Sequence, residues 1–420
     1  GRHLLREPSI MKFFYPDSLD LVDPEFDFKS EEHSNHRVRH RDDVFAHDLL
    51  EEAPYHGLLV SRSMVYGTGG NQRYRQSQRF RLLRTGAHHF FETDQAPNAP
   101  LQIMGDCGAY AYVEQETPPV TVDEVLDFYE SCCCDYVLSV DHVIPGFHTE
   151  RQKSEGNSIP DEWRRRQEIS LSHARSFLKE HQARGHSSVP IGIAQGWDGD
   201  SYAQAVEALQ KMGYDYVALG GLASLATEDI ASTVEQVSGV LRDGTRVHLL
   251  GVSRAREFRR FQNWGVASFD STMPLRQAFM DDKHNYHTLE KDYLAIRLPK
   301  VTASTQLQKK VNEEKISASE AFKHEQRCLR ALRRFDRSKA SVEEVIDRVR
   351  EYELLFNGRD QTDKYRELLE DRPWKDCDCT VCQRLGIEVT LLRGKERNKR
   401  RGFHNMRVLF EKVAPALQGR

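Results

Sequence analysis

Three features are scarce in this sequence of 420 residues, and each scarcity excludes a class of protein. No apolar run approaches the roughly 20 residues that a membrane-spanning helix needs, so we expect no membrane partner. The N-terminus lacks an apolar signal core followed by a small-residue cleavage site, which predicts a cytoplasmic location. Apolar residues reach only 39%, but 20 Phe, 15 Tyr and 4 Trp can still build a core. Together these features predict a charged globular protein, not a disordered one.

A plausible disulfide framework is also missing. Three of the eight cysteines are adjacent at 132–134, and two others form a Cys-x-Cys pair. Such spacings suit disulfides poorly in a chain of this length, which favours a reducing compartment.

The net charge of −4 hides an asymmetry between two parts of the chain. Residues 301–420 hold 27 Lys and Arg against 20 Asp and Glu, a balance of +7, whereas the remaining 300 residues balance at −11. A basic C-terminal part is typical of a surface that meets a polyanion, although a solvated helical surface would give the same count.

Short apolar runs alternate with amphipathic helical patterns between residues 57 and 298. Helical patterns include 121–132, 201–213 and 253–265. Continuous apolar strands between helices favour a parallel sheet, and eight such units predict an α/β fold of the (β/α)₈ TIM-barrel type. A doubly wound open sheet is the alternative, but the sequence has no G-x-G-x-x-G motif to support it. The expected strands are 57–61, 101–105, 136–140, 189–194, 214–220, 246–252, 265–270 and 293–298.

Three other segments interrupt or follow this rhythm. Residues 66–91 are glycine-rich and then basic, which predicts a hairpin or loop, and the polar residues 146–163 predict a substrate loop after a strand. From residue 304 the pattern becomes helical, and Ser341 with Glu344 predicts a capping box. We therefore expect a catalytic barrel over 11–300, a helical insertion over 301–372 and a zinc-binding subdomain over 373–420.

The cysteine cluster near the C-terminus predicts a metal site. Cys377, Cys379 and Cys382 give the spacing C-x-C-x₂-C, and His404 follows after 21 intervening residues. Zinc favours four tetrahedral Cys and His ligands, and a Cys₃His set leaves no position open for water. We expect a structural Zn²⁺; reduced, buried cysteines beside an unrelated histidine are the alternative.

Three aspartates follow predicted strands directly: Asp106, Asp141 and Asp270. Because all strand ends of a barrel open on one face, these carboxylates should converge at its mouth. A carboxylate pair there suits chemistry at an anomeric carbon, with one as nucleophile and one as acid or base. Taken alone, each aspartate more often begins a loop, but three of them in the same register shift that balance.

Four stretches, in order across residues 100–405, resemble the tRNA-guanine transglycosylase superfamily. "MGDCGAYAY" resembles its D-S-G-G-F-Q segment, and "IGIAQG" with "GGLA" resembles its G-I-V-Q-G strand and G-G-L-A turn. "GVASFDSTMPLRQA" is similar to its G-x-D-x-F-D-C-V-x-P-T-R-x-A block. The cysteine cluster ending in "FHN" is similar to its zinc site. The resemblance implies a barrel enzyme that exchanges guanine for a 7-deazaguanine in nucleic acid.

The resemblance also implies catalytic roles. Asp270 would attack C1′ of the target nucleoside and expel guanine, leaving a covalent glycosyl-aspartate. Asp106 would act as general base on the incoming base, which then takes back C1′. Two displacements retain the configuration at C1′ and need no ATP.

A base pocket is implied in the same way. Asp141 would accept hydrogen bonds from the donor edge of the base, and Gln195 would contact its carbonyl. A base in a duplex would first have to be flipped out. The turn of Gly220, Gly221 and Leu222 would close the pocket. Tyr110 and Leu250 would sandwich the ring of the base. Arg276 would lie near a phosphate.

The N-terminal stretch "MKFFYPDSLDLVDPEFDF" resembles the Dpd-type DNA-guanine transglycosylase branch, which places 7-cyano-7-deazaguanine (preQ0) in DNA within bacterial modification clusters. Ser224 and Leu225 stand where the bacterial tRNA enzymes continue V-G-E, which favours a base with a small cyano group. We expect no C-terminal RNA-binding domain of the archaeal type. DNA is thus the expected substrate, with tRNA as the alternative. The resemblance allows a partner ATPase of the same cluster and a homodimer through the zinc region.

A basic strip lies inside the zinc spacing. We predict that it contacts nucleic-acid phosphates, with a solvated surface loop as the alternative. For the arginine-rich residues 72–84 these two interpretations weigh equally. An inactive zinc-containing nucleic-acid-binding subunit is the alternative of another functional class, which the presence of Asp106 and Asp270 disfavours. The strip consists of Arg393, Lys395, Arg397, Lys399, Arg400 and Arg401.

Overall fold

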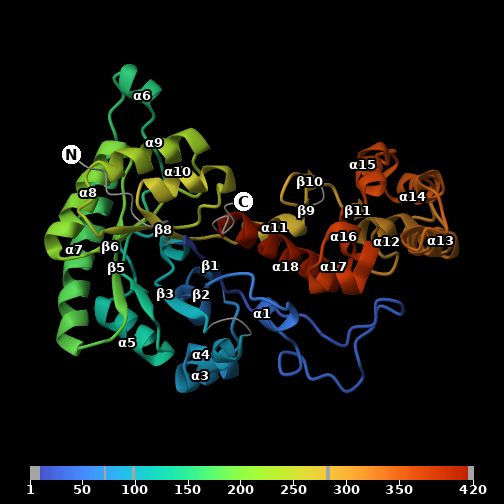
Figure 1. Ribbon diagram of the computed structural model, residues 1–420, viewed down its shortest axis with the longest axis horizontal. Helices are drawn as coiled ribbons and strands as arrows, with labels where there is room; N and C mark the ends of the chain where they lie inside the picture. Colours follow the sequence, from blue (N-terminus) through green and yellow to red (C-terminus); the bar gives the residue numbers. More distant parts are fainter. Residues whose placement is uncertain (1–9, 71, 97–99, 281–283, 415–420) are drawn as a thin grey trace, which may run out of the picture. The chain divides into compact units, whose positions relative to one another are not determined.

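The computed structural model describes residues 10–70, 72–96, 100–280 and 284–414, and it divides into two compact units (Figure 1). The first unit comprises residues 1–19, 55–272 and 412–420, and the second comprises residues 20–54 and 273–411. No helix within the described residues combines the length and apolar character that a membrane crossing requires.

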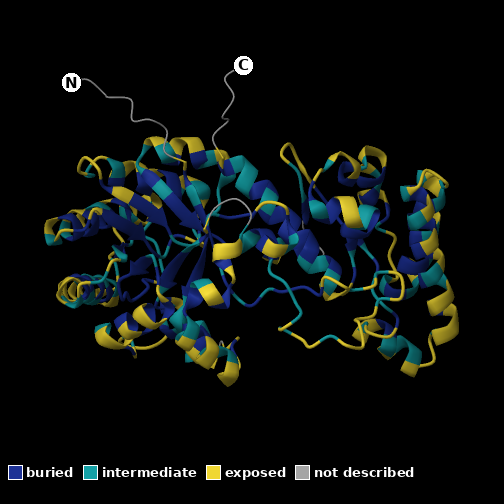
Figure 2. Ribbon diagram, turned by 60° about the horizontal axis from the view of Figure 1, so that its bottom comes forward, coloured by how far each residue is buried: buried dark blue, intermediate teal, exposed yellow. Residues whose placement is uncertain are grey.

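The first unit is a closed barrel of eight parallel strands, in the order β1 to β8. Its inner layer of apolar residues includes Phe14, Met104, Ile191 and Ala218, all fully buried. Figure 2 shows the barrel strands as almost entirely buried. The strands are β1 (Lys12–Pro16), β2 (Gly57–Ser61), β3 (Gln102–Asp106), β4 (Tyr136–Leu138), β5 (Val189–Ala194), β6 (Tyr216–Leu219), β7 (Arg246–Leu249) and β8 (Val266–Asp270).

Helices follow the strands because each carries one apolar face and clear end signals. Thr121 accepts a hydrogen bond from the Glu124 N–H and so starts α5, and Gly213 ends α8 in the left-handed conformation. Helical elements of this unit are α2 (Arg62–Tyr66), η1 (Thr68–Gly70), α3 (Gln76–Thr85), α4 (Ala87–Phe90), η2 (Thr93–Gln95), η3 (Ala109–Tyr112), α5 (Val122–Cys132), α6 (Glu150–Ser154), α7 (Asp161–Arg184), α8 (Gly199–Met212), α9 (Thr227–Ser238), η4 (Ala255–Glu257) and α10 (Phe258–Asn263).

The second unit is mostly helical. Its strands form two small pairs, β9 (Tyr286–His287) with β10 (Asp292–Tyr293) and β11 (Ile296–Arg297) with β12 (Leu391–Leu392). Its helical elements are α1 (Ala46–Leu49), α11 (Met273–Ala278), α12 (Thr305–Asn312), α13 (Ala318–Asp336), α14 (Val342–Asn357), α15 (Asp363–Asp371), α16 (Pro373–Asp376), α17 (Thr380–Leu385), η5 (Gly386–Thr390) and most of α18 (Gly394–Val413).

The predicted barrel is confirmed, but one of its strands was wrongly assigned. Residues 293–298 do not enter the barrel, because they supply β10 and β11 of the second unit. The missing barrel strand is β1, which closes the sheet between β2 and β8. Its sequence "KFFYP" is as apolar as the other strands, but it lies 40 residues before the next strand and so outside their regular spacing.

Two further expectations differ from the structure. Residues 66–91 form no hairpin, because they fold into the end of α2, η1, α3 and α4. The units also cut across the predicted domains: residues 20–54 and 273–300, predicted to be barrel, belong with the helical and zinc-site residues. The helices expected over 301–372 are present, and the Ser341 hydroxyl accepts a hydrogen bond from the Glu344 N–H at 3.1 Å. Residues 415–420 of the predicted zinc subdomain lie outside the described residues.

Candidate active site and metal centre

Asp270 is the last residue of β8, and one of its oxygens is held by two donors. The Gly251 N–H donates to Oδ2 at 3.1 Å, and His248 Nε2 lies 3.0 Å from the same atom. Among the residues that the structure describes, none donates a hydrogen bond to Oδ1. Asp270 is 6% exposed. A carboxylate fixed through one oxygen presents the other as an oriented nucleophile.

A line of buried polar groups continues from this carboxylate into the barrel. His248 lies on β7 opposite Ser268 on β8, and its Nδ1 is 2.6 Å from the Ser268 hydroxyl. That hydroxyl lies 2.5 Å from the Tyr216 hydroxyl. If Tyr216 donates to Ser268 and Ser268 to His248, the neutral imidazole carries its proton on Nε2 and donates it to Asp270.

Asp106 ends β3 and has an unusual acidity. The Gly108 N–H and the Ser61 hydroxyl both hydrogen-bond its carboxylate. Burial, followed by the nearby Asp141 carboxylate, nevertheless raises its pKa from 3.8 to about 7. Asp270 contributes to this rise through its charge, which places both predicted catalytic carboxylates at the same mouth of the barrel. A carboxyl with a pKa near neutrality can exchange protons with a substrate at physiological pH.

The pair of Asp141 and Gln195 sits on the loops after β4 and β5. Gln195 Nε2 donates to Asp141 Oδ2 at 2.7 Å, and its Oε1 accepts from the Ile144 N–H at 3.2 Å. Both side chains are nearly fully buried, and burial raises the pKa of Asp141 to about 6. A Cβ at Gly220 would lie 2.3 Å from Gln195 Nε2, so the glycine leaves the space that Gln195 fills.

The other predicted pocket residues fall on neighbouring loops. Tyr110 lies in η3 with 58% of its surface exposed, and the charges of Asp141 and Asp270, after burial, raise the pKa of its hydroxyl. Leu250 follows β7 and packs against the barrel core. Two other predicted pocket residues follow β6: Leu222 is buried, and Gly221 adopts a left-handed conformation with φ of 80°. Arg276 is exposed in α11 and belongs to the second unit.

Cys107, the residue after Asp106, is a buried thiol. It is 1% exposed, and its Sγ lies 3.2 Å from the Tyr112 hydroxyl and 3.5 Å from Asp141 Oδ1. Burial and then the charge of Asp141 raise the pKa of this thiol well above its ordinary value. It therefore stays protonated and serves as a packing and donor group.

The predicted metal ligands converge in the second unit. The ligand atoms of Cys377, Cys379, Cys382 and His404 all lie within 4.8 Å of one another. His404 Nδ1 is 3.4–3.5 Å from each sulfur. A tetrahedral zinc ion with Zn–S near about 2.3 Å and Zn–N near about 2.0 Å requires an N···S edge of about 3.5 Å, so the donor set fits zinc.

Surrounding groups fix the orientation of the histidine. His404 Nε2 lies 2.7 Å from the His287 carbonyl oxygen and donates its proton there, which leaves the Nδ1 lone pair for a metal. The Tyr286 ring stacks on the His404 ring at 4.3 Å between centroids, and its hydroxyl lies 3.2 Å from Cys382 Sγ. All four coordination positions are taken by protein atoms, which is typical of a structural site.

The basic strip is folded into the protein, which is a correction to its predicted role. Four of its arginines are at most 3% exposed. Side chains that are buried and paired cannot reach a phosphate backbone, so the prediction of nucleic-acid contact is wrong for these four. Lys399 is half-buried and donates to the Leu21 carbonyl at 2.9 Å, while Lys395 remains exposed. The four buried residues are Arg393, Arg397, Arg400 and Arg401.

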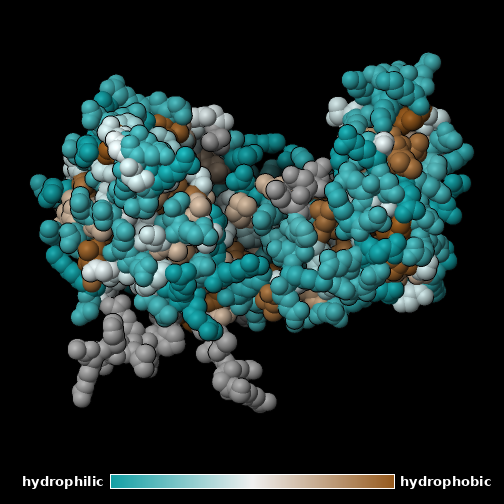
Figure 3. All heavy atoms as spheres, turned by 90° about the horizontal axis from the view of Figure 1, so that it is seen from above, coloured by the Kyte–Doolittle hydropathy of each residue, from teal (hydrophilic) through white to brown (hydrophobic). Residues whose placement is uncertain are grey.

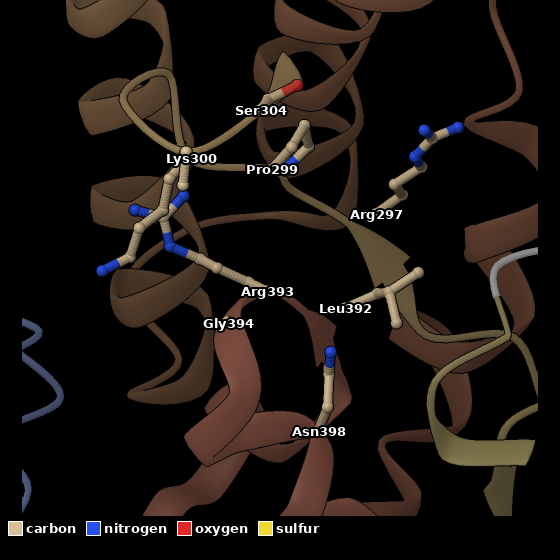
Figure 4. Close-up of a pocket in the computed structure, with 9 residues that line it drawn as sticks. Arg297, Pro299, Lys300, Ser304, Leu392, Arg393, Gly394 and Asn398 are labelled. Atoms are coloured by element: carbon tan, nitrogen blue, oxygen red, sulfur yellow. The ribbon is translucent and has the colours of Figure 1, made fainter. Parts of the chain in front are cut away.

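These arginines hold together separate parts of the second unit. Arg393 and Arg397 both pair with Glu31, and Arg393 also pairs with Glu325. Hydrogen bonds from Arg393 lower the pKa of Glu31 to about 2 against the opposing effect of burial. Lys300 lies 3.2 Å from the same carboxylate. Lys300 and Arg393 both line a cavity of 260 Å³ (Figure 4). The sequence analysis missed that Glu31, in the segment 20–54, pairs with two arginines of the strip.

Comparison with known proteins fits this geometry. The sequence profile of the family described as Queuine tRNA-ribosyltransferase matches residues 84–341. A DNA-guanine transglycosylase of Salmonella montevideo is 42% identical over 411 residues, which cover 96% of this chain and 97% of the relative. Queuine tRNA-ribosyltransferases match shorter stretches. That of Marinobacter nauticus is 30% identical over 34% of this chain and 36% of its own length. That of Stenotrophomonas maltophilia strain R551-3 is 32% identical over 27% of this chain and 31% of its own length.

A closed parallel barrel with carboxylates at its mouth and a Cys₃His cluster that suits zinc defines the class as a TIM-barrel protein with a candidate metal centre. The chain belongs to the queuine tRNA-ribosyltransferase family, the superfamily anticipated from its motifs, and is a guanine transglycosylase.

His248 contacts Asp270 and was not among the predicted site residues, because a single histidine inside the apolar run "RVHLLGV" is more often a hydrogen-bonded core residue. We expect His248→Phe to lower kcat for base exchange by about 10- to 100-fold, since Asp270 loses one of its two donors. His248→Gln can still donate a hydrogen bond and should recover part of that loss. Steady-state kinetics of both variants, with thermal unfolding as the stability control, test the role. Equal losses in the two variants would mean that His248 acts through packing.

Proposed function

We propose that the protein exchanges guanine in DNA for a 7-deazaguanine, with 7-cyano-7-deazaguanine as the incoming base. The observation that supports it most is the presence of both an Asp270 carboxylate held through one oxygen and an Asp106 carboxyl whose pKa is raised to about 7. The chain is also 42% identical over nearly its whole length to a DNA-guanine transglycosylase. The same reaction on tRNA is the second candidate, because tRNA-acting relatives match shorter stretches of the chain.

In the first half of the reaction Asp270 Oδ1 attacks C1′ of the target nucleoside. The bond from C1′ to N9 of guanine breaks with its electron pair going to N9, the guanine anion takes a proton from solvent water, and the sugar remains esterified to Asp270. His248 and the Gly251 N–H hold Oδ2, so Oδ1 needs no reorientation before it attacks.

The second half reverses these bonds with a different base. Asp106 accepts the N9 proton of the incoming base as that nitrogen attacks C1′, and Asp270 leaves as a carboxylate. Asp141 and Gln195 offer a carboxylate and an amide to the edge of the base, while Gly220 and Gly221 leave room for them. Two inversions return C1′ to its original configuration.

The Cys₃His cluster would hold a structural Zn²⁺ in this protein. Zinc bound there stabilises the fold and has no open position for substrate. We expect about one zinc per chain by atomic absorption, and the loss of that zinc, with a lower unfolding temperature, in Cys382→Ser. Ser131→Ala, an exposed change in the barrel unit, is the control. A Cys382→Ser variant that keeps its full zinc content would contradict the assigned ligand set.

The assay for the proposed function compares two polymers. The purified protein is incubated with radiolabelled guanine or 7-cyano-7-deazaguanine and either duplex DNA or bulk tRNA, and acid-insoluble label is counted. Label in DNA supports the proposal, whereas label in tRNA alone would replace it with the second candidate. The DNA arm is repeated with single-stranded and bubble-containing DNA, because a flipped base is easier to reach where pairing is already open. No label in any polymer would favour an inactive binding subunit.

Two partners expected from the resemblance remain proposals. A partner ATPase of the same modification cluster could open the duplex, in which case bubble DNA would be labelled without it and duplex DNA only with it. A homodimer through the zinc region is tested by light scattering of the intact chain.

A further inference from the structure

An unusually acid-free stretch lies between β2 and β3. Residues 53–91 contain no Asp, Glu or Lys, although the protein has 64 acidic residues in 420, so about six would be expected in 39 positions. All of its charged side chains other than histidine are arginines. They are Arg62, Arg73, Arg75, Arg79, Arg81 and Arg84.

This stretch adjoins the candidate active site within the first unit. It enters α2 directly after Ser61, whose hydroxyl hydrogen-bonds the Asp106 carboxylate. The following turn η1 packs on η3, the element that carries Tyr110. The approach is so close that a Cβ at Gly69 would lie only 2.3 Å from the Ala111 carbonyl oxygen. The first of its arginines, Arg62, therefore follows the end of β2, and three others lie in α3, a helix that packs next to α4 and α5 (Figure 1).

Five of these six arginines lack a neutralising partner in the part of the chain that the structure describes; Arg62 lies 4.0 Å from Glu124. Within the described residues, no acidic side chain lies within 4.0 Å of the guanidinium of Arg73, Arg75, Arg79, Arg81 or Arg84, whereas Arg393, Arg397 and Arg400 of the basic strip form ion pairs. Arg75 is the N-cap of α3, and the first turn of that helix has no acid. Arg75 and Arg79 also have the i, i+4 spacing at which like charges repel. This arrangement costs helix stability, and an anion bound there would relieve it.

Aromatic rings are interleaved with these cations. The guanidinium groups of Arg62 and Arg79 lie 4.6 and 5.2 Å from the centre of the Tyr66 ring, and Arg79 also lies 5.5 Å from the Phe80 ring. Tyr66 is 38% exposed and Phe80 56% exposed. Most of the face shown in Figure 3 is hydrophilic, and Tyr66 and Phe80 belong to the large apolar side chains that are exposed among the described residues. Exposed rings beside arginines are the combination that binds single-stranded nucleic acid, through stacking and phosphate contacts.

We propose that residues 62–70 and 72–84 form a docking surface for the phosphate backbone of substrate DNA next to the flipped nucleotide, with Phe80 and Tyr66 as stacking platforms for unpaired bases. This inference rests on the proposed function and names the surface that would hold its polymer. Arginine, unlike lysine, offers a planar fork of donors that matches a phosphate in two contacts.

The test removes three cations from this surface. We expect Arg73→Gln/Arg75→Gln/Arg79→Gln to weaken DNA binding at least about tenfold near physiological salt, and to reduce the slope of log Kd against log salt by about 2–3. Binding is measured by fluorescence anisotropy of a bubble-containing duplex over a series of NaCl concentrations. Circular dichroism and thermal unfolding confirm that the variant is folded.

A matched variant controls for net charge. Arg327→Gln/Arg330→Gln/Arg337→Gln removes three exposed arginines of α13 and its C-cap in the second unit, none with an acidic partner among the described residues. Equal weakening in this control would overturn the proposal, as would an unchanged Kd and salt slope in the first triple variant. Phe80→Ala keeps the charge and should weaken binding to the bubble more than to the closed duplex.

Failure of this inference can be told from failure of the proposed function. If the unmodified protein labels DNA but the first triple variant binds it normally, the docking surface is wrong and the function stands. If the unmodified protein labels only tRNA, the DNA function falls, and loss of tRNA binding in the same variant would overturn the DNA assignment of this surface.

Discussion

Asp270→Asn is expected to abolish base exchange, with a fall in rate of at least about 10³-fold, and to abolish any covalent adduct with DNA. Asparagine keeps the size of the side chain and can still accept the hydrogen bonds from His248 and the Gly251 N–H. The amide lacks the nucleophilic oxygen that would bond C1′. The measurements are label incorporation and a denaturing gel of protein incubated with labelled DNA.

Another aspartate of the barrel, far from the mouth, supplies the control for this experiment. Asp215 is exposed and precedes β6, so it lies at the end of the barrel opposite the mouth. Asp215→Asn should exchange bases at the unmodified rate and form the same adduct. Persistent exchange by Asp270→Asn would show that another group is the nucleophile.

Asp106→Asn should separate the two halves of the reaction. Guanine is still expelled by Asp270, but the incoming base has no acceptor for its N9 proton, so the covalent adduct should accumulate while exchange falls by about 10²- to 10⁴-fold. An adduct that fails to accumulate would mean that Asp106 acts in the first half instead.

The acidity of Asp106 also predicts a pH profile. Its pKa is raised to about 7 by burial and then by the Asp141 charge, so the fraction of ionised base increases as pH rises through 7. Below that pH the exchange rate should fall about tenfold per pH unit. Asp141→Asn removes the nearby negative charge and should move the midpoint of the profile to lower pH. A rate independent of pH between 5.5 and 8.5, as a rough window around that pKa, would contradict the role of Asp106.

The same shift affects stability with a definite sign. Because the folded-state pKa lies above the ordinary value of 3.8, the folded protein binds an extra proton between these two pH values. The contribution of Asp106 to the free energy of unfolding therefore falls as pH rises from about 4 to about 7. Asp106→Asn should raise the unfolding temperature by a few degrees at about pH 8 and change it little at about pH 4.

Much of the site followed from local sequence patterns. Asp106 and Asp270 were placed correctly at strand ends, because short apolar runs mark parallel strands and the next polar residue begins the loop. The Cys₃His set was found by spacing alone, since three of its ligands lie within six residues. The one barrel strand that was missed, β1, is identified by its pairing with β8 over 250 residues away, which no local pattern indicates.

The basic strip and the arginines of residues 62–84 show the limit of reading charge from sequence. Both are runs of cations, and from sequence alone the basic strip was the one predicted to contact nucleic acid. Glu31, more than 350 positions away, forms ion pairs with the buried Arg393 and Arg397. Among the described residues, no acidic side chain lies within 4.0 Å of the guanidinium of Arg73, Arg75 or Arg79.

The sequence by itself determined the barrel class, the strand-end carboxylates, the metal ligands and the family, because these depend on residue type and short-range order. Only the tertiary structure decided that β1 closes the barrel, that His248 orients Asp270, and which cations are free to meet a polyanion. The physical reason is that pairing, burial and neutralisation of a charge depend on neighbours brought together from distant parts of the chain.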